Sequence, residues 1–495
     1  MQPKTHRLIS ALLLLALLLT LAAPALAQEP TTAAATTDVA AAKLSCAAFS
    51  AAEQQEFDAL TALKAVETLS GAELARYDAL AQQLSCYNTQ FAVSAQLEQA
   101  TYATQAAPLT PGVCDTAGPI EVEGTIIGTT PTAYATLGAA FTAINGGTHT
   151  GVISIDVCGD TVETVTASLN ASGTGSASYT SVTIAPIGGP RVITGSVVGA
   201  IIKLTGADYV TIDGRIGGVG RNLTVNNTST AAATAAIWLT STGVGAGATN
   251  NVIRNLELAG GATQNTSTSS TYGIILASNN TAISTTSNSD DNDNNSFIDN
   301  RIVRVRYGIV TRGTTTNLTL NTIVTDNIIG PTAFGADEIG KVGIFMQADQ
   351  GATVSRNTVQ FVGGAYANTT SGADRVGIGI GQESWSMAPT TLTSNTYVVT
   401  KNIIHDIVEE RTFSAVGLLL GTTGGGSATN NLVANNFIYN VKSNGTSGDN
   451  TVGLGISGGH TDTVVFNSVS MTGDVDPNPS AAATANFGSG IRIAN

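Results

Sequence analysis

The stretch from Gly343 to Val359, GIFMQADQGATVSRNTV, contains two short motifs that recur along the second half of the chain. The first motif is a glycine, an aliphatic residue, any residue and usually a second aliphatic residue; its glycines are Gly273, Gly308, Gly343, Gly377, Gly417, Gly453 and Gly490. The second is an apolar residue, two variable residues, an asparagine, one more residue and an aliphatic residue; its asparagines are Asn300, Asn327, Asn357, Asn402, Asn436 and Asn467. The two motifs alternate, and the glycines recur every 34 to 40 residues.

This period predicts a solenoid. Each motif is long enough for one short strand, and a single repeat cannot bury its own apolar side chains, whereas stacked repeats can. Asparagine suits the bend between two strands because it tolerates the left-handed backbone conformation, and its amide can hydrogen-bond to the asparagine of the next coil. We therefore expect a mainly β fold with an asparagine ladder, in which Gly308, Gly343 and Gly377 lie over one another along a common axis.

With these motifs the chain resembles the right-handed parallel β-helix proteins of the pectate-lyase-like superfamily, and most of all the Asn-rich β-helix repeats of large secreted bacterial surface proteins. The segment YATLGAAFTAIN (134–145), followed by GVISIDVCGDTVET (151–164), resembles the capping helix and first strand of that group. DYVTIDG (208–214) resembles one of its coils. The resemblance implies a right-handed parallel β-helix over residues 134–495. The superfamily includes lyases, hydrolases, adhesins and phage tailspikes, so the fold does not select an activity.

The residues before the β-helix predict export and a separate helical hairpin. Residues 1–27 have a basic start, an apolar run and a small-residue cleavage site, typical of a signal peptide. An Ala/Thr-rich flexible segment (28–44), an α-helical hairpin (45–107) with capping boxes at Ser50 and Ser70, and a linker with a first strand (108–133) follow. No later apolar run is long enough to span a membrane, so we expect an extracellular or cell-surface protein.

The chain has four cysteines, Cys46, Cys86, Cys114 and Cys158. After a signal peptide, such cysteines predict two disulfides rather than thiol or metal chemistry. The hairpin would bring Cys46, before its first helix, beside Cys86, at the end of its second. That pairing leaves Cys114 and Cys158 to tie the linker to the first strands of the β-helix.

The charge of the chain excludes one class of partner. The formal net charge is −14 and charged residues are only 11% of the chain, with no stripe of basic residues. Such a surface does not attract nucleic acid or anionic membranes. The partners that we expect are an extracellular polysaccharide or a cell-surface glycan, and a capping partner or a continuation of the polypeptide at the C-terminal end, where the β-helix looks incomplete.

The glycine motif also predicts the chemistry of one sheet face. Its aliphatic residues point inward, so the variable residue between them points outward, at Ile275, Val310, Phe345, Gly379, Leu419, Gly455 and Arg492. Trp238 joins this column from a matching segment. The column has no carboxylate, histidine or lysine, and general acid–base catalysis needs such groups. The sequence therefore favours a non-enzymatic structural or adhesin-like module.

Three alternative sites remain open. A polysaccharide lyase or glycoside hydrolase would use the ionisable residues Glu383, His405, Asp406, Glu409 and Glu410. A carbohydrate-binding module would use the aromatic residues Trp238, Phe345 and Trp385. The hard oxygens of Asp290, Asp291 and Asp293 could hold Ca²⁺, and no other cofactor is expected.

Overall fold

The structure is a computed structural model, and it describes residues 56, 60, 72–77, 79–80, 112–262, 270–277, 280–283, 292–364, 373–385, 394–410, 413–422, 429–444, 450–459, 461–472, 475 and 488–493. The chain divides into two units, 1–104 and 105–495. In the first unit the described residues are helical, and an ion pair of 2.8 Å joins Arg76 to Glu56. Most of the predicted hairpin, with Cys46 and Cys86, lies outside the described residues, so their disulfide stays a prediction.

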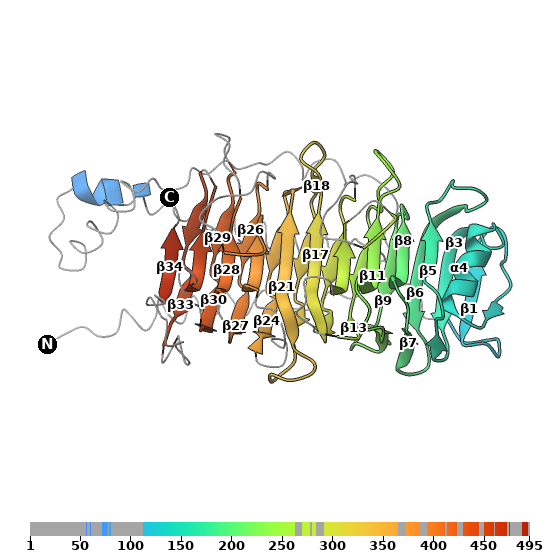
Figure 1. The fold of residues 1–495 in the computed structure, drawn as a ribbon. Coiled ribbons are helices and arrows are strands. Elements are labelled where there is room, and N and C mark those ends of the chain that lie inside the picture. Colours follow the sequence, from blue (N-terminus) through green and yellow to red (C-terminus); the bar gives the residue numbers. More distant parts are fainter. Residues whose placement is uncertain are drawn as a thin grey trace, which may run out of the picture. The chain divides into compact units, whose positions relative to one another are not determined.

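The second unit is a right-handed parallel β-helix; among its described residues, ten successive coils each contribute one strand to each of three parallel stacks (Figure 1). The first stack consists of β3 (Gly151–Val157), β6 (Tyr179–Pro186), β9 (Val210–Asp213), β12 (Val252–Arg254), β15 (Ser296–Ile298), β19 (Ile323–Thr325), β23 (Thr353–Ser355), β26 (Val398–Thr400), β29 (Leu432–Ala434) and β32 (Thr463–Val465).

The second stack consists of β4 (Thr161–Val162), β7 (Arg191–Gly195), β10 (Leu223–Asn227), β13 (Leu256–Ala259), β16 (Arg301–Val303), β20 (Ile328–Ile329), β24 (Thr358–Gly363), β27 (Ile403–Glu409), β30 (Phe437–Ser443) and β33 (Ser468–Ser470). The third consists of β5 (Ala167–Asn170), β8 (Ala200–Thr205), β11 (Thr234–Thr240), β14 (Thr271–Leu276), β17 (Val305–Arg312), β21 (Ile339–Gln347), β25 (Arg375–Ile380), β28 (Ala415–Leu420), β31 (Thr451–Ile456) and β34 (Ser489–Ile493). The short strands β18 (Thr319–Leu320) and β22 (Asp349–Gln350) pair beside them.

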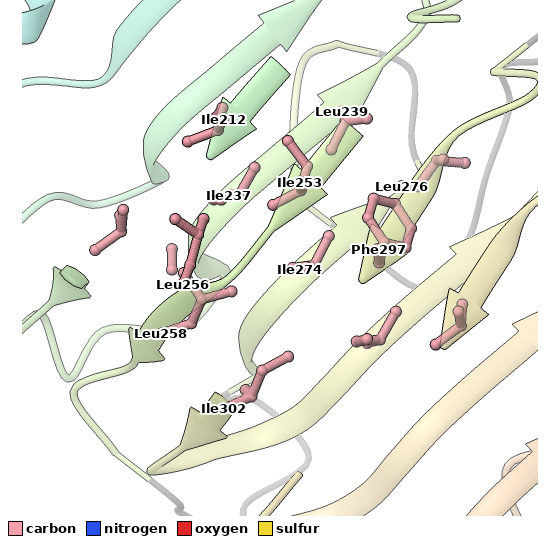
Figure 2. Packing of buried hydrophobic residues seen from close by; sticks show 14 of the residues in the cluster. Ile212, Ile237, Leu239, Ile253, Leu256, Leu258, Ile274, Leu276, Phe297 and Ile302 are labelled. Carbon is pink, nitrogen blue, oxygen red and sulfur yellow. The ribbon is translucent and has the colours of Figure 1, made fainter. Parts of the chain in front are cut away.

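Apolar side chains from all three stacks fill the inside of the coils. Figure 2 shows part of this core, with Ile253 from the first stack, Leu256 from the second and Ile274 from the third. The three side chains are fully buried. Parallel pairing sets Ile274 beside Ile309, and Ile309 beside Ile344, so like side chains repeat along the axis. Each coil is thus buried by its neighbours, as the period of the sequence predicts.

The motif glycines form a column because the coils approach one another too closely for a side chain. A Cβ atom on Gly308 would lie 2.4 Å from the carbonyl oxygen of Gly343, and a Cβ on Gly343 would lie 2.6 Å from that of Gly377. The same Cβ atoms would lie 2.5 Å from Ile329 and 2.3 Å from Val359 of the second stack. The predicted superposition of these glycines along one axis is confirmed.

The asparagine ladder is present, but its asparagines are not the left-handed residues. Asn357 is buried; its Oδ1 accepts hydrogen bonds from the backbone N (3.0 Å) and Nδ2 (2.9 Å) of Asn327, and its Nδ2 donates to Oδ1 of Asn402 (3.0 Å). Positive φ occurs one residue earlier, at Asp299, Asp326, Arg356, Lys401, Asn435 and Phe466. The asparagine motif therefore forms two strands around a bend rather than one strand, and the asparagine follows the left-handed corner with its amide directed inward.

The N-terminal end of the β-helix is covered by α4 (Leu137–Asn145) and by β1 (Ile120–Gly124), which pairs antiparallel with β2 (Thr132–Tyr134) and with β3. Thr136 caps α4 by accepting a hydrogen bond from the backbone N of Ala139 at 3.1 Å. A disulfide joins Cys114 to Cys158 with a Cα–Cα distance of 5.8 Å, which confirms this predicted pair. Among the residues described, no helix is long and apolar enough to cross a membrane.

Candidate functional site

The variable column of the glycine motif points away from the core, as predicted, and the outer face that it forms is buried. Ile275 and Val310 have no exposed surface, and Phe345 is 2% exposed. With Trp238 and other residues they form a second hydrophobic cluster, against which Trp385 packs. The alternation of a strand shows which side chains point away from the core, but segments outside the strands cover this face. The outward direction of the column is therefore confirmed, and its exposure to solvent is small.

Two of the three residues of the predicted aromatic site are buried. The indole N–H of Trp238 donates to the carbonyl oxygen of Ala277 at 2.9 Å, and the ring is 5% exposed. Phe345 is buried in the same cluster. Trp385 is half-buried, and its ring lies where a side chain on Gly455 would be, 2.5 Å from the position of a Cβ atom. Trp238 and Phe345 thus present no free ring face for a ligand.

Two of the predicted catalytic carboxylates neutralise buried cations. Oε1 of Glu383 lies 2.9 Å from Nζ of Lys341, and Oε2 of Glu409 lies 3.1 Å from Nε of Arg375. Glu409 and Arg375 have no exposed side-chain surface, and burial lowers the pKa of Arg375. Glu410 directly follows the last residue of β27 and is exposed. These three carboxylates therefore do not share one contact: two pair with different cations and the third is exposed.

The other two candidates, His405 and Asp406, lie on the outer face of the second stack within a column of aromatic rings. The rings of His405 and Tyr439 are paired in register on β27 and β30 and stack with centroids 4.7 Å apart and 8° between planes. Phe361 meets His405 edge-on at 5.8 Å, Phe334 meets Phe361 at 5.1 Å, and Phe437 lies 4.9 Å from Tyr439. We call these five residues the ring column.

The ring column combines exposed apolar surface with polar groups at its edge. Phe437 is 44% exposed and Phe334 is 39% exposed. Nδ1 of His405 lies 2.6 Å from Oδ2 of Asp406, and Nδ2 of Asn440 donates to the same carboxylate. Burial and the negative charge of Asp406 raise the pKa of Tyr439, which keeps its hydroxyl protonated. The face therefore offers flat apolar rings beside hydrogen-bonding groups.

Sequence reasoning identified His405 and Asp406 only as a dense ionisable group and missed the rings around them. A signal was available, because His405 and Tyr439 each stand three residues after a ladder asparagine, Asn402 and Asn436. The third residue after the ladder asparagine occupies the same place in each repeat. Comparing this residue between repeats therefore places His405 and Tyr439 in one column.

The predicted calcium site is only partly described. Asp290 and Asp291 lie outside the described residues, and Oδ1 of Asp293 accepts a hydrogen bond from the backbone N of Leu320 at 2.8 Å. Within the described part of the chain, no three His, Cys, Asp or Glu side chains lie close enough together to hold a metal ion. The calcium site stays a prediction.

Comparison with known proteins finds a likeness of structure. No family model matches the sequence, and no curated protein matches it. The tailspike protein of Dettilon is 13% identical with a TM-score of 0.40; the match covers 73% of this chain and 66% of that protein, so the chain spans less than two thirds of its length. Pectate lyase Pel9A is 14% identical with a TM-score of 0.37, over 72% of this chain and 80% of the lyase.

The Streptococcus pneumoniae surface protein and adhesin PfbA is 10% identical with a TM-score of 0.34, over 72% of this chain and 94% of PfbA. At such identities the likeness concerns architecture and not activity. What the strand pairing of this chain establishes is its fold, a right-handed parallel β-helix.

Proposed function

We propose that this chain is an exported, non-enzymatic β-helix protein that binds glycans at the cell surface or outside the cell. The observation that carries the proposal is the ring column, in which Phe361 of β24 meets His405 of β27 edge-on, His405 stacks on Tyr439 of β30, and Phe437 is 44% exposed. Neighbouring strands are about 4.8 Å apart, so a linear glycan lying along the axis can meet a ring at each coil. Tyrosine and histidine add polar atoms that can hydrogen-bond to hydroxyl groups.

The positions of the ionisable candidates support a binding role rather than catalysis. Hydrolysis of a glycosidic bond normally uses two carboxyl groups that flank the sugar. Glu383 and Glu409 are each engaged with a buried cation, and His405 and Asp406 bond to each other at 2.6 Å. In the proposed binding site, His405 contributes a ring of the ring column, and Asp406 contributes a carboxylate beside it.

The proposed location rests on the sequence of residues 1–27, which is typical of a signal peptide. We also propose that a partner covers the last described coil. Ile491 and Ile493 of β34 are 55% and 67% exposed, whereas Leu454, the partner of Ile491 in β31, is fully buried. Exposed parallel strand edges of this kind are usually covered in solenoids.

Binding to a panel of neutral and acidic polysaccharides, with and without Ca²⁺, tests the proposal. Tyr439→Ala and Phe437→Ala should each weaken binding roughly five-fold, because a stacked ring contributes about 1 kcal/mol. Tyr209→Asn is a matched control; it removes a ring that is 57% exposed on another coil, at a left-handed position that asparagine tolerates. No binding to any polysaccharide, or equal binding by all variants, would reject the ring column. New reducing or unsaturated ends would reject the non-enzymatic assignment.

A further inference from the structure

Three buried basic residues follow one another along the axis at the start of the third-stack strands, and the middle one, Lys341, contacts Tyr307 of the buried outer face. Arg306, Lys341 and Arg375 directly precede Tyr307, Val342 and Val376, which pair in register in β17, β21 and β25. Their exposed fractions are 5%, 6% and 0%. The coil before has threonine at this position and the coil after has alanine, Thr271 and Ala415.

A column of buried basic residues does not increase the stability of the fold by itself. Burying a cation costs several kcal/mol of desolvation, and well-packed apolar residues are often as stable as a buried ion pair. Sequences depart from simple packing rules mainly at functional sites. The neighbouring coils show that small uncharged residues fit this position. A ligand for the basic residues is therefore worth seeking.

The carboxylates that pair with Lys341 and Arg375 differ in how firmly they are held. Glu409 lies within strand β27, and its side chain has no exposed surface. Glu383 lies after the end of β25, and its side chain is 31% exposed. Nζ of Lys341 also donates to the hydroxyl of Tyr307 at 3.2 Å, and burial with the negative charge of Glu383 raises the pKa of Tyr307. Glu383 thus pairs with Lys341 from a position outside the strands, where a change of its backbone breaks no ladder hydrogen bond.

The segment around Glu383 is bound to this face by specific contacts. Ser457 Oγ donates to Oε1 of Gln382 at 2.6 Å, and the backbone N of Trp385 donates to Oδ2 of Asp374 at 2.7 Å. The guanidinium carbon of Arg492 lies 5.4 Å from the centre of the Trp385 ring. Residues 381–385, which we call the acidic segment, therefore contact several coils.

Glycines on the sheet leave room for this segment. A Cβ atom on Gly379 would lie 2.3 Å from the carbonyl oxygen of Gln382, and a Cβ on Gly455 would lie 2.5 Å from the Trp385 ring. Other coils have Phe345 and Leu419 at the same position of the glycine motif. On this face Lys341 binds a carboxylate, Gly455 leaves room for an aromatic ring, and Gly379 leaves room for the backbone between them.

We infer that this face is a binding site for an acidic peptide, and that the acidic segment occupies it in this structure. Lys341 and Tyr307 hold the peptide carboxylate, and the space over Gly455 takes an aromatic side chain two residues later. A peptide is favoured over other anions because the group bound here is itself a peptide. A tethered segment competes at an effective concentration in the millimolar range, so the wild-type chain should bind an external peptide weakly.

Fluorescence anisotropy with a labelled peptide Gly-Gln-Glu-Ser-Trp tests the inference on the full chain. Glu383→Gln should bind this peptide about ten-fold more tightly than the wild-type chain, because the tethered carboxylate no longer competes. The double variant Glu383→Gln with Lys341→Met should bind it no better than the wild type. A control peptide with glutamine in place of glutamate should not bind. Circular dichroism checks that each variant folds.

Trp385→Ala is a second way to loosen the segment, since it removes the ring over Gly455 and leaves Glu383 tethered to the face by fewer contacts. It should also bind the labelled peptide more tightly than the wild-type chain does. Equal affinity of the wild type and both release variants would overturn the inference. Equal binding of the two peptides would also overturn it, as would competition by a uronic acid oligosaccharide with no binding of the peptide.

Discussion

Asp349 lies inside the β-helix, at the start of β22, with no exposed surface. Its Oδ2 accepts hydrogen bonds from the hydroxyls of Tyr397, at 3.1 Å, and of Thr311. Burial penalises the charged carboxylate and raises the pKa of Asp349 to about 7, and these hydroxyl donors reduce the rise. The residue is therefore protonated in the folded chain over a pH range in which the unfolded chain has already lost the proton.

This difference gives a stability prediction with a defined sign. Between about pH 4 and pH 7 the folded chain holds one more proton at Asp349 than the unfolded chain, so the free energy of unfolding falls as pH rises, by at most about 1.4 kcal/mol per pH unit. Asp349→Asn should remove this contribution, flatten the slope and raise stability at pH 7 relative to pH 4. Urea unfolding at several pH values measures it.

A matched control is Asp337→Asn, because the side chain of Asp337 is 57% exposed. That variant should keep the wild-type slope. Burial and neighbouring carboxylates raise the pKa of Asp156 to about 6. Asp156 therefore contributes to the fall in stability over the same pH range in every variant. The comparison is therefore one of slopes. A slope in Asp349→Asn equal to that of the wild type would contradict the assignment of the buried proton.

Residue type predicted the asparagine ladder but not the conformation at each position. Asparagine was a reasonable choice for the left-handed corner, yet Arg356 and Lys401 have φ of 56° and 59° there, and the asparagines follow them. The ladder amide must point toward the next coil, where Asn357 bonds to Asn402. Tertiary hydrogen bonding therefore assigned the asparagine to the inward position, and single-residue preference could not show this.

For the strands, the repeat in the sequence predicted which side chains face the core but not which outer side chains are covered. The motif spacing predicted which side chains face the core, and Ile274 and Ile309 are fully buried there. It could not predict that Phe345, on the opposite face, is 2% exposed, because residues outside the glycine motif, such as Ile283 and Trp385, belong to or pack against the same cluster. The ring column has a related explanation, since His405 and Tyr439 lie on β27 and β30, strands that the asparagine motif does not distinguish from the strands before the asparagine.

The glycine column makes a prediction about one strand. Gly343→Ala should lower the free energy of unfolding by about 3 kcal/mol or more, because the new methyl group would lie 2.3 Å from Val359 and 2.6 Å from the carbonyl oxygen of Gly377. Gly490→Ala is the matched control in the same column, where the nearest atom is 4.0 Å away. Thermal or urea unfolding compares them. Equal losses in both variants would contradict the explanation by close coil approach.

The β-helix as a whole is a linear stack in which each coil contacts only its neighbours, so stability can vary along the axis. Its N-terminal end has a covalent tie, the Cys114–Cys158 disulfide, which closes a sequence separation of 44 residues. For a loop of that length, the chain-entropy model gives a stabilisation of about 4 kcal/mol. The same end has β1 and α4 over its first coils.

Replacing both cysteines, Cys114→Ser with Cys158→Ser, should therefore destabilise one end first. We expect amide hydrogen exchange, followed by mass spectrometry, to become faster in β1, β3 and β5 and to change little in β28 and β31, because nearest-neighbour coupling weakens with each coil. Reduction of the wild-type chain should give the same pattern. Uniform acceleration along the whole axis would show instead that the ten coils unfold as one cooperative unit, and that the disulfide stabilises all of them equally.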